Sequence, residues 1–325
     1  MIRRAGWVLA VVAGVVSLVL AVPLGAGMLG VAQLVSFRPE IALASVVAAV
    51  VAALVGLLLP RGSRLALVPL VAVLVVAGAV QTTVLLVRDH QPTVAASSAE
   101  RTVTVLGFNT LGRAPASTLA RLVEEQHAQV VVLTETSAAT AQKTAALLAD
   151  AGIPMQVHTS ASIDPWVDGV ALLVSPGLGT YPTSTPLPLR HGGLVTRAQG
   201  APTLVAVHPV SPSSVGSMSA WRAETRAAAD ECAANPGAVV AGDFNATIDH
   251  PGLRDLGPCV DVAAEVGRAA SGTWPAAVPS WLATPIDHVL VDGRTWRPVS
   301  FRVLPATGGS DHRPVVAVVA ARAPQ

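Results

Sequence analysis

Charged and aromatic side chains are scarce in this sequence. Only 13% of the 325 residues are charged and 3% are aromatic, whereas 52% are hydrophobic. A soluble globular domain carries about 25% charged residues, so this composition does not describe one ordinary soluble domain. The high apolar content excludes a disordered chain, and the length suggests about two domains.

Lysine and cysteine are nearly absent as well. Lys143 is the single lysine, and Cys232 and Cys259 are the two cysteines. Two cysteines exclude a disulfide-rich scaffold, and no Cys/His cluster has the spacing of a zinc site. The sequence leaves open whether these cysteines form a disulfide or stay as separate buried thiols.

The few charges are distributed unevenly along the chain. Residues 1–87 contain five arginines and one acidic residue, Glu40. Of the 21 basic and 20 acidic residues in total, 16 basic and 19 acidic therefore remain for 88–325, a formal net charge of −3. The chain thus combines an apolar N-terminal quarter with a slightly acidic remainder of ordinary composition.

Three long uncharged runs occupy the N-terminal quarter. A transmembrane helix needs about 20 apolar residues, so we predict a membrane anchor over 1–87, with three transmembrane helices near 5–25, 41–59 and 65–87. Residues 5–87 would then contact the lipid bilayer. The first run also resembles a cleaved signal peptide. Two further apolar runs follow it at once, which favours an uncleaved helix.

Arginine placement predicts the orientation of this anchor. Arginines at 3–4 precede the first helix, and two more lie in the turn at 61–64, whereas Arg38 and Arg88 lie at the opposite ends. Positive charge favours the cytoplasmic side, and four arginines outweigh two. We therefore expect an integral plasma-membrane protein whose chain is extracytoplasmic after residue 87, with a polar linker over 88–100.

Strand and helix patterns alternate over 101–322. We predict strands at 102–108, 130–133, 169–174, 204–207, 238–241, 286–291, 299–304 and 315–319, and helices at 117–126, 136–149 and 215–234. The proline-rich stretch 176–188 is interpreted as a loop. Many strands with few helices predict an α/β sandwich.

Polar side chains recur where these strands begin or end. They are Asn109, Glu135, His208, Asp243, Asn245, Asp287, His288, Asp311 and His312. Strand ends can converge at one edge of a sheet, so we expect one pocket. Oxygen ligands from Glu135, Asp311 and Asn109 suit Mg²⁺ or Mn²⁺. Histidines beside acids supply general acid/base capacity, which favours metal-assisted hydrolysis with water as the nucleophile.

The motifs around these residues form an ordered series. They are Leu-Gly-Phe-Asn109, Leu-Thr-Glu135, Val-Ala-Val-His208-Pro, Gly-Asp243-Phe-Asn245-Ala, Pro-Ile-Asp287-His288 and Ser-Asp311-His312-Arg-Pro-Val. In this order they resemble the endonuclease/exonuclease/phosphatase superfamily, which has the deoxyribonuclease-I-like fold. The resemblance implies a four-layer α/β sandwich, with two packed β-sheets flanked by helices, as a catalytic domain over 101–322.

The resemblance also implies where the metal and the phosphate would be bound. Glu135 would bind the divalent metal, Mg²⁺ or Mn²⁺, with Asn109 and Asp311 close by. Asp243 and Asn245 would hold the scissile phosphate and the attacking water.

Two catalytic histidines are implied in the same way. Asp287 would orient His312, which would contact the phosphate or prime the nucleophile. His208 would be the second catalytic histidine, placed to stabilise the phosphate or to protonate the leaving group. Whether Asp243 or His312 takes the proton of the water stays open.

Other residues have weaker functional signals. Arg222 is interpreted as an exposed helix arginine, with a pocket role as the alternative, and Trp274 either packs or shapes the substrate pocket. His288 is expected to support the structure. Five histidines match no motif and are expected to be surface or structural residues: His90, His127, His158, His191 and His250.

The sequence thus predicts a membrane-anchored, divalent-metal-dependent phosphoesterase with an outward-facing catalytic domain. Its substrate would be a phosphodiester or phosphomonoester in a lipid head group, nucleotide or nucleic acid, and no protein partner is implied. One lysine and a net charge of −3 argue against a dedicated duplex nuclease, which gains affinity from basic side chains. The alternatives are a catalytically inactive membrane-bound binding domain and a secreted-side nuclease.

Overall fold

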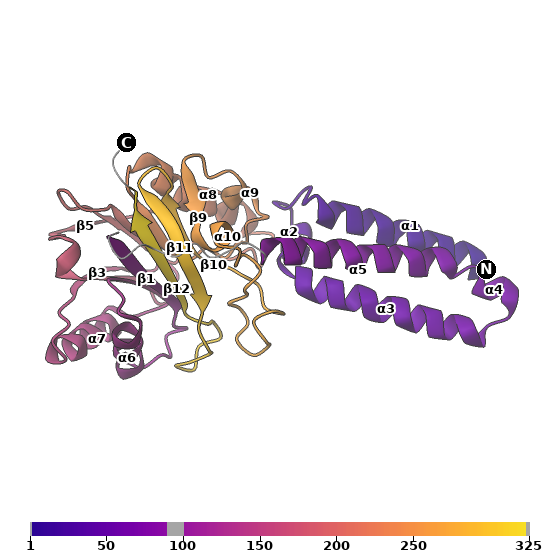
Figure 1. Cartoon of the computed structure of the whole chain (residues 1–325), viewed down its shortest axis with the longest axis horizontal. Coiled ribbons are helices and arrows are strands. Elements are labelled where there is room, and N and C mark those ends of the chain that lie inside the picture. The colour runs from indigo at the N-terminus through magenta and orange to yellow at the C-terminus, as the bar shows by residue number, and fades with distance from the viewer. Residues whose placement is uncertain (1, 90–100, 323–325) are drawn as a thin grey trace. The chain divides into compact units, whose positions relative to one another are not determined.

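The chain divides into two compact units, Met1–Arg88 and Asp89–Gln325. The computed structural model describes residues 2–89 and 101–322. Most of the linker predicted at 88–100, and with it His90, lies outside the described residues. Figure 1 shows a helical first unit and a second unit built on β-sheets.

Five helices make up the first unit. They are α1 (Ile2–Ala21), α2 (Val31–Ser36), α3 (Arg38–Leu58), α4 (Arg61–Arg64) and α5 (Val68–Arg88). Helix α5 packs against both α1 and α3. The side chain of Arg64 caps the end of α3, where its guanidinium donates to the carbonyls of Gly56 and Leu57 at 3.0 Å each. Near the other end of α3, the buried Arg38 donates to Gln81 of α5 at 2.6 Å.

Two helical segments, not the three predicted, have the length and composition of a membrane span in the described residues. They are Arg38–Leu58 and Arg61–Arg88. The first predicted span, near 5–25, corresponds to α1, of which the part with described side chains, Gly6–Ala21, is apolar. The prediction overestimated this segment because the chain leaves the helix after Ala21, before the glycines at 25 and 27.

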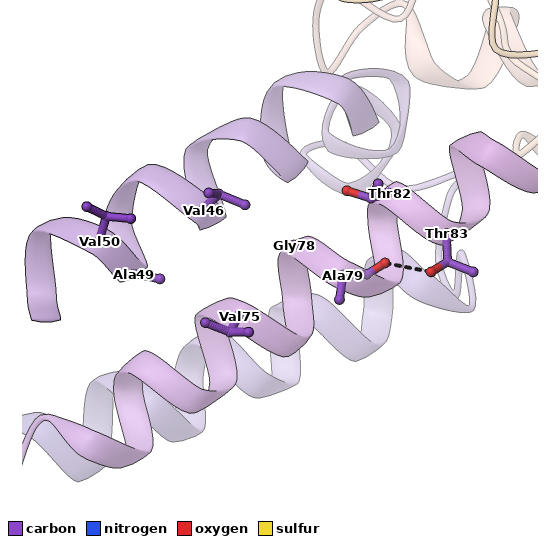
Figure 2. Close-up of a pocket in the computed structure, with 8 residues that line it drawn as sticks. All are labelled: Val46, Ala49, Val50, Val75, Gly78, Ala79, Thr82 and Thr83. Carbon is purple, nitrogen blue, oxygen red and sulfur yellow. Dashed lines mark hydrogen bonds between the residues drawn. The ribbon is translucent and has the colours of Figure 1, made fainter.

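An apolar groove of about 470 Å³ runs between α3 and α5 (Figure 2). Val46, Ala49, Val50, Val75, Gly78, Ala79, Thr82 and Thr83 line it. A Cβ atom at Gly78 would lie only 3.1 Å from Cγ2 of Val46, which shows that the two helices approach closely there. The lining carries no titratable side chain, so the groove offers no acid/base chemistry.

Two six-stranded sheets form the second unit. The first has the order β11-β12-β1-β2-β4-β3 and the second the order β5-β6-β7-β8-β10-β9. The strands of the first sheet are β1 (Thr102–Asn109), β2 (Val130–Thr134), β3 (Gln156–Ser160), β4 (Val170–Val174), β11 (Trp296–Val303) and β12 (Val315–Ala321). Those of the second are β5 (Ser184–Pro186), β6 (Gly193–Thr196), β7 (Leu204–Val207), β8 (Val239–Asp243), β9 (Cys259–Asp261) and β10 (Asp287–Asp292).

Each sheet contains one parallel pair of strands among antiparallel ones. The parallel pairs are β1 with β2 and β7 with β8. The apolar side chains of both sheets pack against each other in a shared core, which includes Val105, Leu172, Leu204 and Val239. This core holds the two sheets face to face.

Helices flank the two packed sheets (Figure 1). On the first sheet, α6 (Ala116–Gln126) and α7 (Ala138–Asp150) bury Leu119 and Leu148 in a second core with Leu106 and Leu133. Helix α8 (Met218–Ala234) packs on β7, β8 and β10 of the second sheet. The short helices α9 (Pro251–Arg254) and α10 (Val262–Glu265) lie between β8 and β10 in the chain. The predicted α/β sandwich of two packed sheets flanked by helices is confirmed.

Sequence patterns missed four short strands, β3, β5, β6 and β9. The stretch 176–188, predicted as a loop, contains a 3-10 turn at Pro176–Leu178 and the strand β5. Three of these strands, β3, β5 and β9, lie at sheet edges. An edge strand of three to five residues buries few side chains, so it leaves little apolar periodicity in the sequence. Helix α8 also begins at Met218, three residues later than predicted.

Candidate active site

The two parallel strand pairs bring four polar residues to one end of the sandwich. Asn109 ends β1 opposite Thr134 of β2, and Glu135 follows β2. In the other sheet, His208 follows β7 and Asp243 ends β8, with Val207 opposite Gly242. The carboxyl ends of parallel strands lie at the same sheet edge, so each sheet contributes two of the four side chains.

Two antiparallel strands, β10 and β12, contribute further site residues at or just before their amino ends. Asp287 opens β10 directly opposite Asp243 of β8. The loop before β12 carries Asp311 and His312, and Ser310 of this loop donates to the carbonyl of Asn109 at 2.7 Å. Antiparallel pairing with β8 and β1 therefore places these residues at the same edge.

The backbone is unusual at three positions of this edge. Glu135 and Asn245 both have φ of 48°, a left-handed conformation that is uncommon for non-glycine residues. Gly242 has φ of 150°, and a Cβ atom there would lie 2.0 Å from the carbonyl oxygen of Val207. The glycine of the Gly-Asp-Phe-Asn motif is thus required by the close approach of β7.

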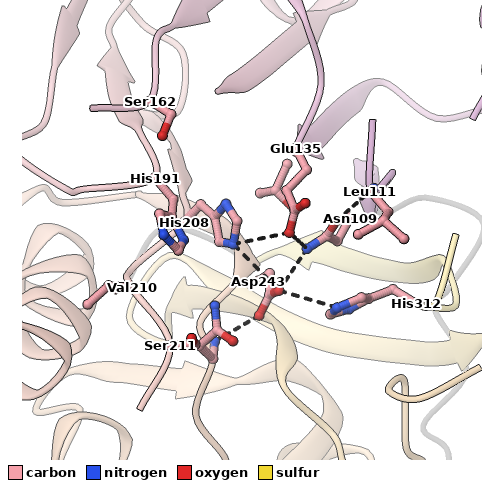
Figure 3. A network of polar contacts seen from close by, with 12 residues as sticks. Asn109, Leu111, Glu135, Ser162, His191, His208, Val210, Ser211, Asp243 and His312 are labelled. Carbon is pink, nitrogen blue, oxygen red and sulfur yellow. Dashed lines mark hydrogen bonds and ion pairs between the residues drawn. The ribbon is translucent and has the colours of Figure 1, made fainter. Parts of the chain in front are cut away.

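Asn109 joins the two sheets through its side-chain amide (Figure 3). Its Nδ2 donates to Oε1 of Glu135 and to Oδ2 of Asp243, both at 2.9 Å. The Nε2 atom of His208 lies 3.9 Å from the same oxygen of Glu135 and 3.7 Å from that of Asp243. One amide and one imidazole therefore face two carboxylates.

His312 lies between two further carboxylates. Its Nδ1 is 2.9 Å from Oδ2 of Asp287, and its Nε2 is 3.6 Å from Oδ2 of Asp243. Burial alone would lower the pKa of His312, but the charges of Asp287 and Asp243 outweigh burial and raise this pKa to about 9. In this structure His312 is an imidazolium at neutral pH.

Asp243 and His208 are both fully buried, and burial shifts their pKa values in opposite directions. Burial raises the pKa of Asp243 to about 7, although the charge of His312 opposes the rise. Burial and the charges of His191 and His312 lower the pKa of His208 well below its usual value. His208 is therefore neutral at pH 7, whereas Asp243 changes protonation near that pH.

Asn245 is held by hydrogen bonds on both sides. Its backbone N–H donates to Oδ1 of Asp243 at 2.8 Å, and its Nδ2 donates to the carbonyl of Pro209 at 3.1 Å. One of its two amide hydrogens is thus directed at the loop that follows His208. The backbone contact fixes the carboxylate of Asp243.

The predicted metal ligands occupy different surroundings. The Glu135 side chain is 20% exposed, and Asp311 has one buried oxygen without a hydrogen-bond partner among the described residues, while its other oxygen accepts from Nε1 of Trp274 at 2.9 Å. In Asn109 the nitrogen faces Glu135, and the oxygen that we predicted as a ligand accepts from the N–H of Leu111 at 3.0 Å.

A second group of side chains has the spacing of a metal site. Ligand atoms of Asp243, Asp287 and His312 lie within 4.8 Å of one another. Together with Glu135 and the unpaired oxygen of Asp311, the edge offers several carboxylate oxygens. Carboxylate-rich sites suit hard divalent cations, so the carboxylates of this edge fit a divalent metal, whereas the imidazolium form of His312 has no lone pair for it.

Three of the remaining histidines, His191, His250 and His288, are buried. His288 is buried, with Nδ1 2.6 Å from Asp261 and Nε2 2.8 Å from the carbonyl of Ala246. His250 accepts from the N–H of Thr247 at 2.7 Å. His191, also predicted to be structural or at the surface, is buried with its ring centroid 4.7 Å from that of His208.

His191 carries little sequence signal, because it lies in no recognisable motif and follows a loop with no apolar periodicity. His127 is exposed and His158 is half-buried on β3. Arg222 is exposed on α8, as predicted. Nε1 of Trp274, for which the sequence left a packing role and a pocket role open, donates to Asp311 of the site.

Comparison with known proteins gives a family match and several structural matches. The model of the Endonuclease/Exonuclease/phosphatase family matches residues 106–312, the span that contains every predicted site residue. No curated protein sequence matches the chain.

Solved structures share the fold at low sequence identity. An endonuclease/exonuclease/phosphatase from Beutenbergia cavernae is 19% identical with a TM-score of 0.55, covering 68% of this chain and 72% of that one. D. rerio TDP2 complexed with single strand DNA product is 15% identical with a TM-score of 0.54, covering 68% and 99%. An endonuclease/exonuclease/phosphatase from Bacteroides vulgatus is 14% identical with a TM-score of 0.51, covering 69% and 100%.

Proposed function

This chain belongs to the endonuclease/exonuclease/phosphatase family, and from this we propose that it is a divalent-metal-dependent phosphoesterase that uses water as the nucleophile. The observation that carries the proposal is the continuous set of contacts around Asp243. Asn109, His208 and His312 all lie within 4 Å of this one carboxylate. Neutral, cationic and anionic groups are thus gathered at one buried point.

The metal would be held by Glu135 and Asp311, with Asn109 beside them. Glu135 is partly open to solvent, and Asp311 has an unpaired buried oxygen. A bound Mg²⁺ or Mn²⁺ would act as a Lewis acid on a phosphoryl oxygen.

The protonation states of Asp243 and His312 support different catalytic roles for the two residues. A general base works best when its pKa lies near the operating pH, and the pKa of Asp243 is about 7. His312 is cationic, so it suits a donor to the phosphoryl oxygens, where negative charge develops. We therefore assign proton acceptance from water to Asp243 and charge stabilisation to His312, with Asp287 orienting the imidazole.

His208 and Asn245 would also stabilise the negative charge that develops on the phosphoryl oxygens. His208 faces Asp243 and Glu135 through Nε2, and Asn245 keeps one amide hydrogen beyond its bond to Pro209. Both would stabilise the phosphoryl group or the leaving group.

Hydrolysis of bis-p-nitrophenyl phosphate by the detergent-solubilised full chain tests this proposal. We expect activity with Mg²⁺ or Mn²⁺, its loss with EDTA, and a decrease of about 10²–10⁴-fold in kcat/KM for His312→Ala. His158→Ala on the edge strand β3 is the matched control and should retain activity. Activity that survives both EDTA and His312→Ala would contradict the proposed site.

We further propose that the first unit anchors the enzyme in the plasma membrane with the catalytic unit outside. The two candidate spans meet at a turn around Pro60, and Arg61 and Arg64 lie at the start of the second span, beside this turn. If positive charge holds this turn in the cytoplasm, residue 88 lies on the outer side. The disulfide between Cys232 and Cys259 supports this orientation, because disulfides persist in oxidising compartments.

The substrate class that we propose is a phosphoester in a lipid head group, nucleotide or nucleic acid. D. rerio TDP2 was solved with a single strand DNA product, which keeps nucleic acid among the candidates. The net charge of −3 over 88–325 and the single lysine weigh against duplex DNA. A panel of plasmid DNA, RNA, phospholipids and nucleotides would distinguish these classes.

A further inference from the structure

Glu224 is a buried carboxylate of α8 that no sequence motif marked. Its Oε2 accepts two backbone N–H groups, from Val210 at 2.9 Å and from Arg190 at 3.1 Å. Val210 lies two residues after His208, and Arg190 directly precedes His191. One carboxylate oxygen therefore ties together the two segments that carry these histidines.

The same two segments are joined by a backbone hydrogen bond. The N–H of His208 donates to the carbonyl of Gly192 at 3.0 Å. Together with the bonds to Glu224, this contact holds the segments 190–192 and 208–210 against each other at two points. The side chains of His191 and His208 lie next to each other as a result (Figure 3).

Hydrogen bonds do not fix the ring of His208 within the described residues. Its Nδ1 is buried without a hydrogen-bond partner, and its Nε2 lies 3.7 and 3.9 Å from carboxylate oxygens, beyond hydrogen-bond distance. The ring of His191, with a centroid distance of 4.7 Å and an interplanar angle of 59°, is the aromatic group packed against it. Ring packing is thus the contact that can set the orientation of His208.

We propose that Glu224 and His191 are positioning residues for His208. Glu224 holds the segments 190–192 and 208–210 together. The ring of His191 packs against the ring of His208 and so keeps Nε2 of His208 directed at Glu135 and Asp243. The inference rests on the proposed phosphoesterase activity for its kinetic consequences. Its structural part is independent of that activity.

Substitution of Glu224 in the full chain tests whether its carboxylate positions His208. Glu224→Ala removes the shared acceptor of the Val210 and Arg190 N–H groups, and a displacement of about 1 Å at His208 would lower kcat about 100-fold with little change in KM. Glu224→Gln keeps an acceptor oxygen and should recover most of kcat. Glu231→Ala removes another carboxylate of α8, outside the site, and should leave kcat unchanged. A Gln variant as impaired as the Ala variant would overturn the role of Glu224.

Substitution of His191 separates ring packing from direct substrate binding. His191→Phe keeps an aromatic ring against His208 and should retain kcat, whereas His191→Ala should lose it. If Phe is as impaired as Ala and KM rises, the imidazole nitrogen contacts substrate and the positioning role is wrong.

Nuclear magnetic resonance of the histidine rings gives a readout that does not need turnover. In the detergent-solubilised, histidine-labelled full chain, Glu224→Ala should shift the ring signals of His191 and His208, and Glu231→Ala should leave them in place. Unchanged ring signals in Glu224→Ala would overturn the inference. If the wild-type protein hydrolyses no phosphoester while these shifts occur, the proposed function fails and the positioning inference stands.

Discussion

Asp243 is the residue on which the polar contacts of the candidate site converge. Its Oδ1 accepts from the backbone of Asn245, and its Oδ2 accepts from Asn109 and faces two histidines. A carboxylate in such surroundings responds to burial and to cations in opposite directions. Burial dominates here, which brings the pKa of Asp243 to about 7.

Asp287→Asn tests the electrostatics at the scale of single residues. The amide that replaces the carboxylate still offers an oxygen to Nδ1 of His312, but it lacks the negative charge that stabilises the imidazolium. We expect its pKa in the metal-free protein to fall from about 9 toward the ordinary value of 6.5, as measured by a histidine nuclear magnetic resonance titration. Asp255→Asn, at an exposed position, is the control. An unchanged pKa of His312 in Asp287→Asn would contradict this account.

At the scale of elements, the site depends on where strands end. The parallel pairs β1–β2 and β7–β8 each place two functional residues at the same edge. Gly242 allows β7 to approach β8 at this edge because any Cβ would collide with Val207. The strand ends were predictable, since a polar residue after an apolar run is visible in the sequence.

The disulfide joins two elements of the second unit, the end of α8 and the start of β9. Cys232 and Cys259 are separated by 27 positions, and closing a loop of this length stabilises a fold by about 3.5 kcal/mol. We expect Cys232→Ser/Cys259→Ser to lower the free energy of unfolding by about that amount, measured by urea denaturation. Thiol titration of the denatured, unreduced wild-type chain should detect no free cysteine, and two reactive thiols would contradict the disulfide.

At the scale of the whole molecule, the two units differ in where their apolar side chains lie. The first unit exposes many large apolar side chains, among them Leu58 at 87% and Val87 at 67%. Such a surface is unfavourable in water and suited to a hydrocarbon environment. The second unit buries its apolar side chains between two sheets, as a water-soluble domain does.

Reporter fusions test the proposed orientation of these units. Alkaline phosphatase fused after residue 100 should be active in a bacterial host, because this position is predicted to lie outside the cytoplasm. A fusion after residue 62, in the arginine-bearing turn, is the matched control and should be inactive. A green fluorescent protein that fluoresces when fused after residue 100 would reverse the orientation.

By itself, the sequence determined the division into an apolar quarter and an α/β remainder, most of the longer strands, and the polar residues at their ends. These features are local, since charge, hydropathy and periodicity are read within a few residues. The tertiary structure decided which of those residues meet. Asn109 and Asp243 are 134 positions apart and still share a hydrogen bond, and the disulfide, left open by the sequence, closes across 27 positions. His191 and Glu224 gain their place only because two sheets and α8 pack together, and such contacts between distant segments leave no periodic signal in the chain.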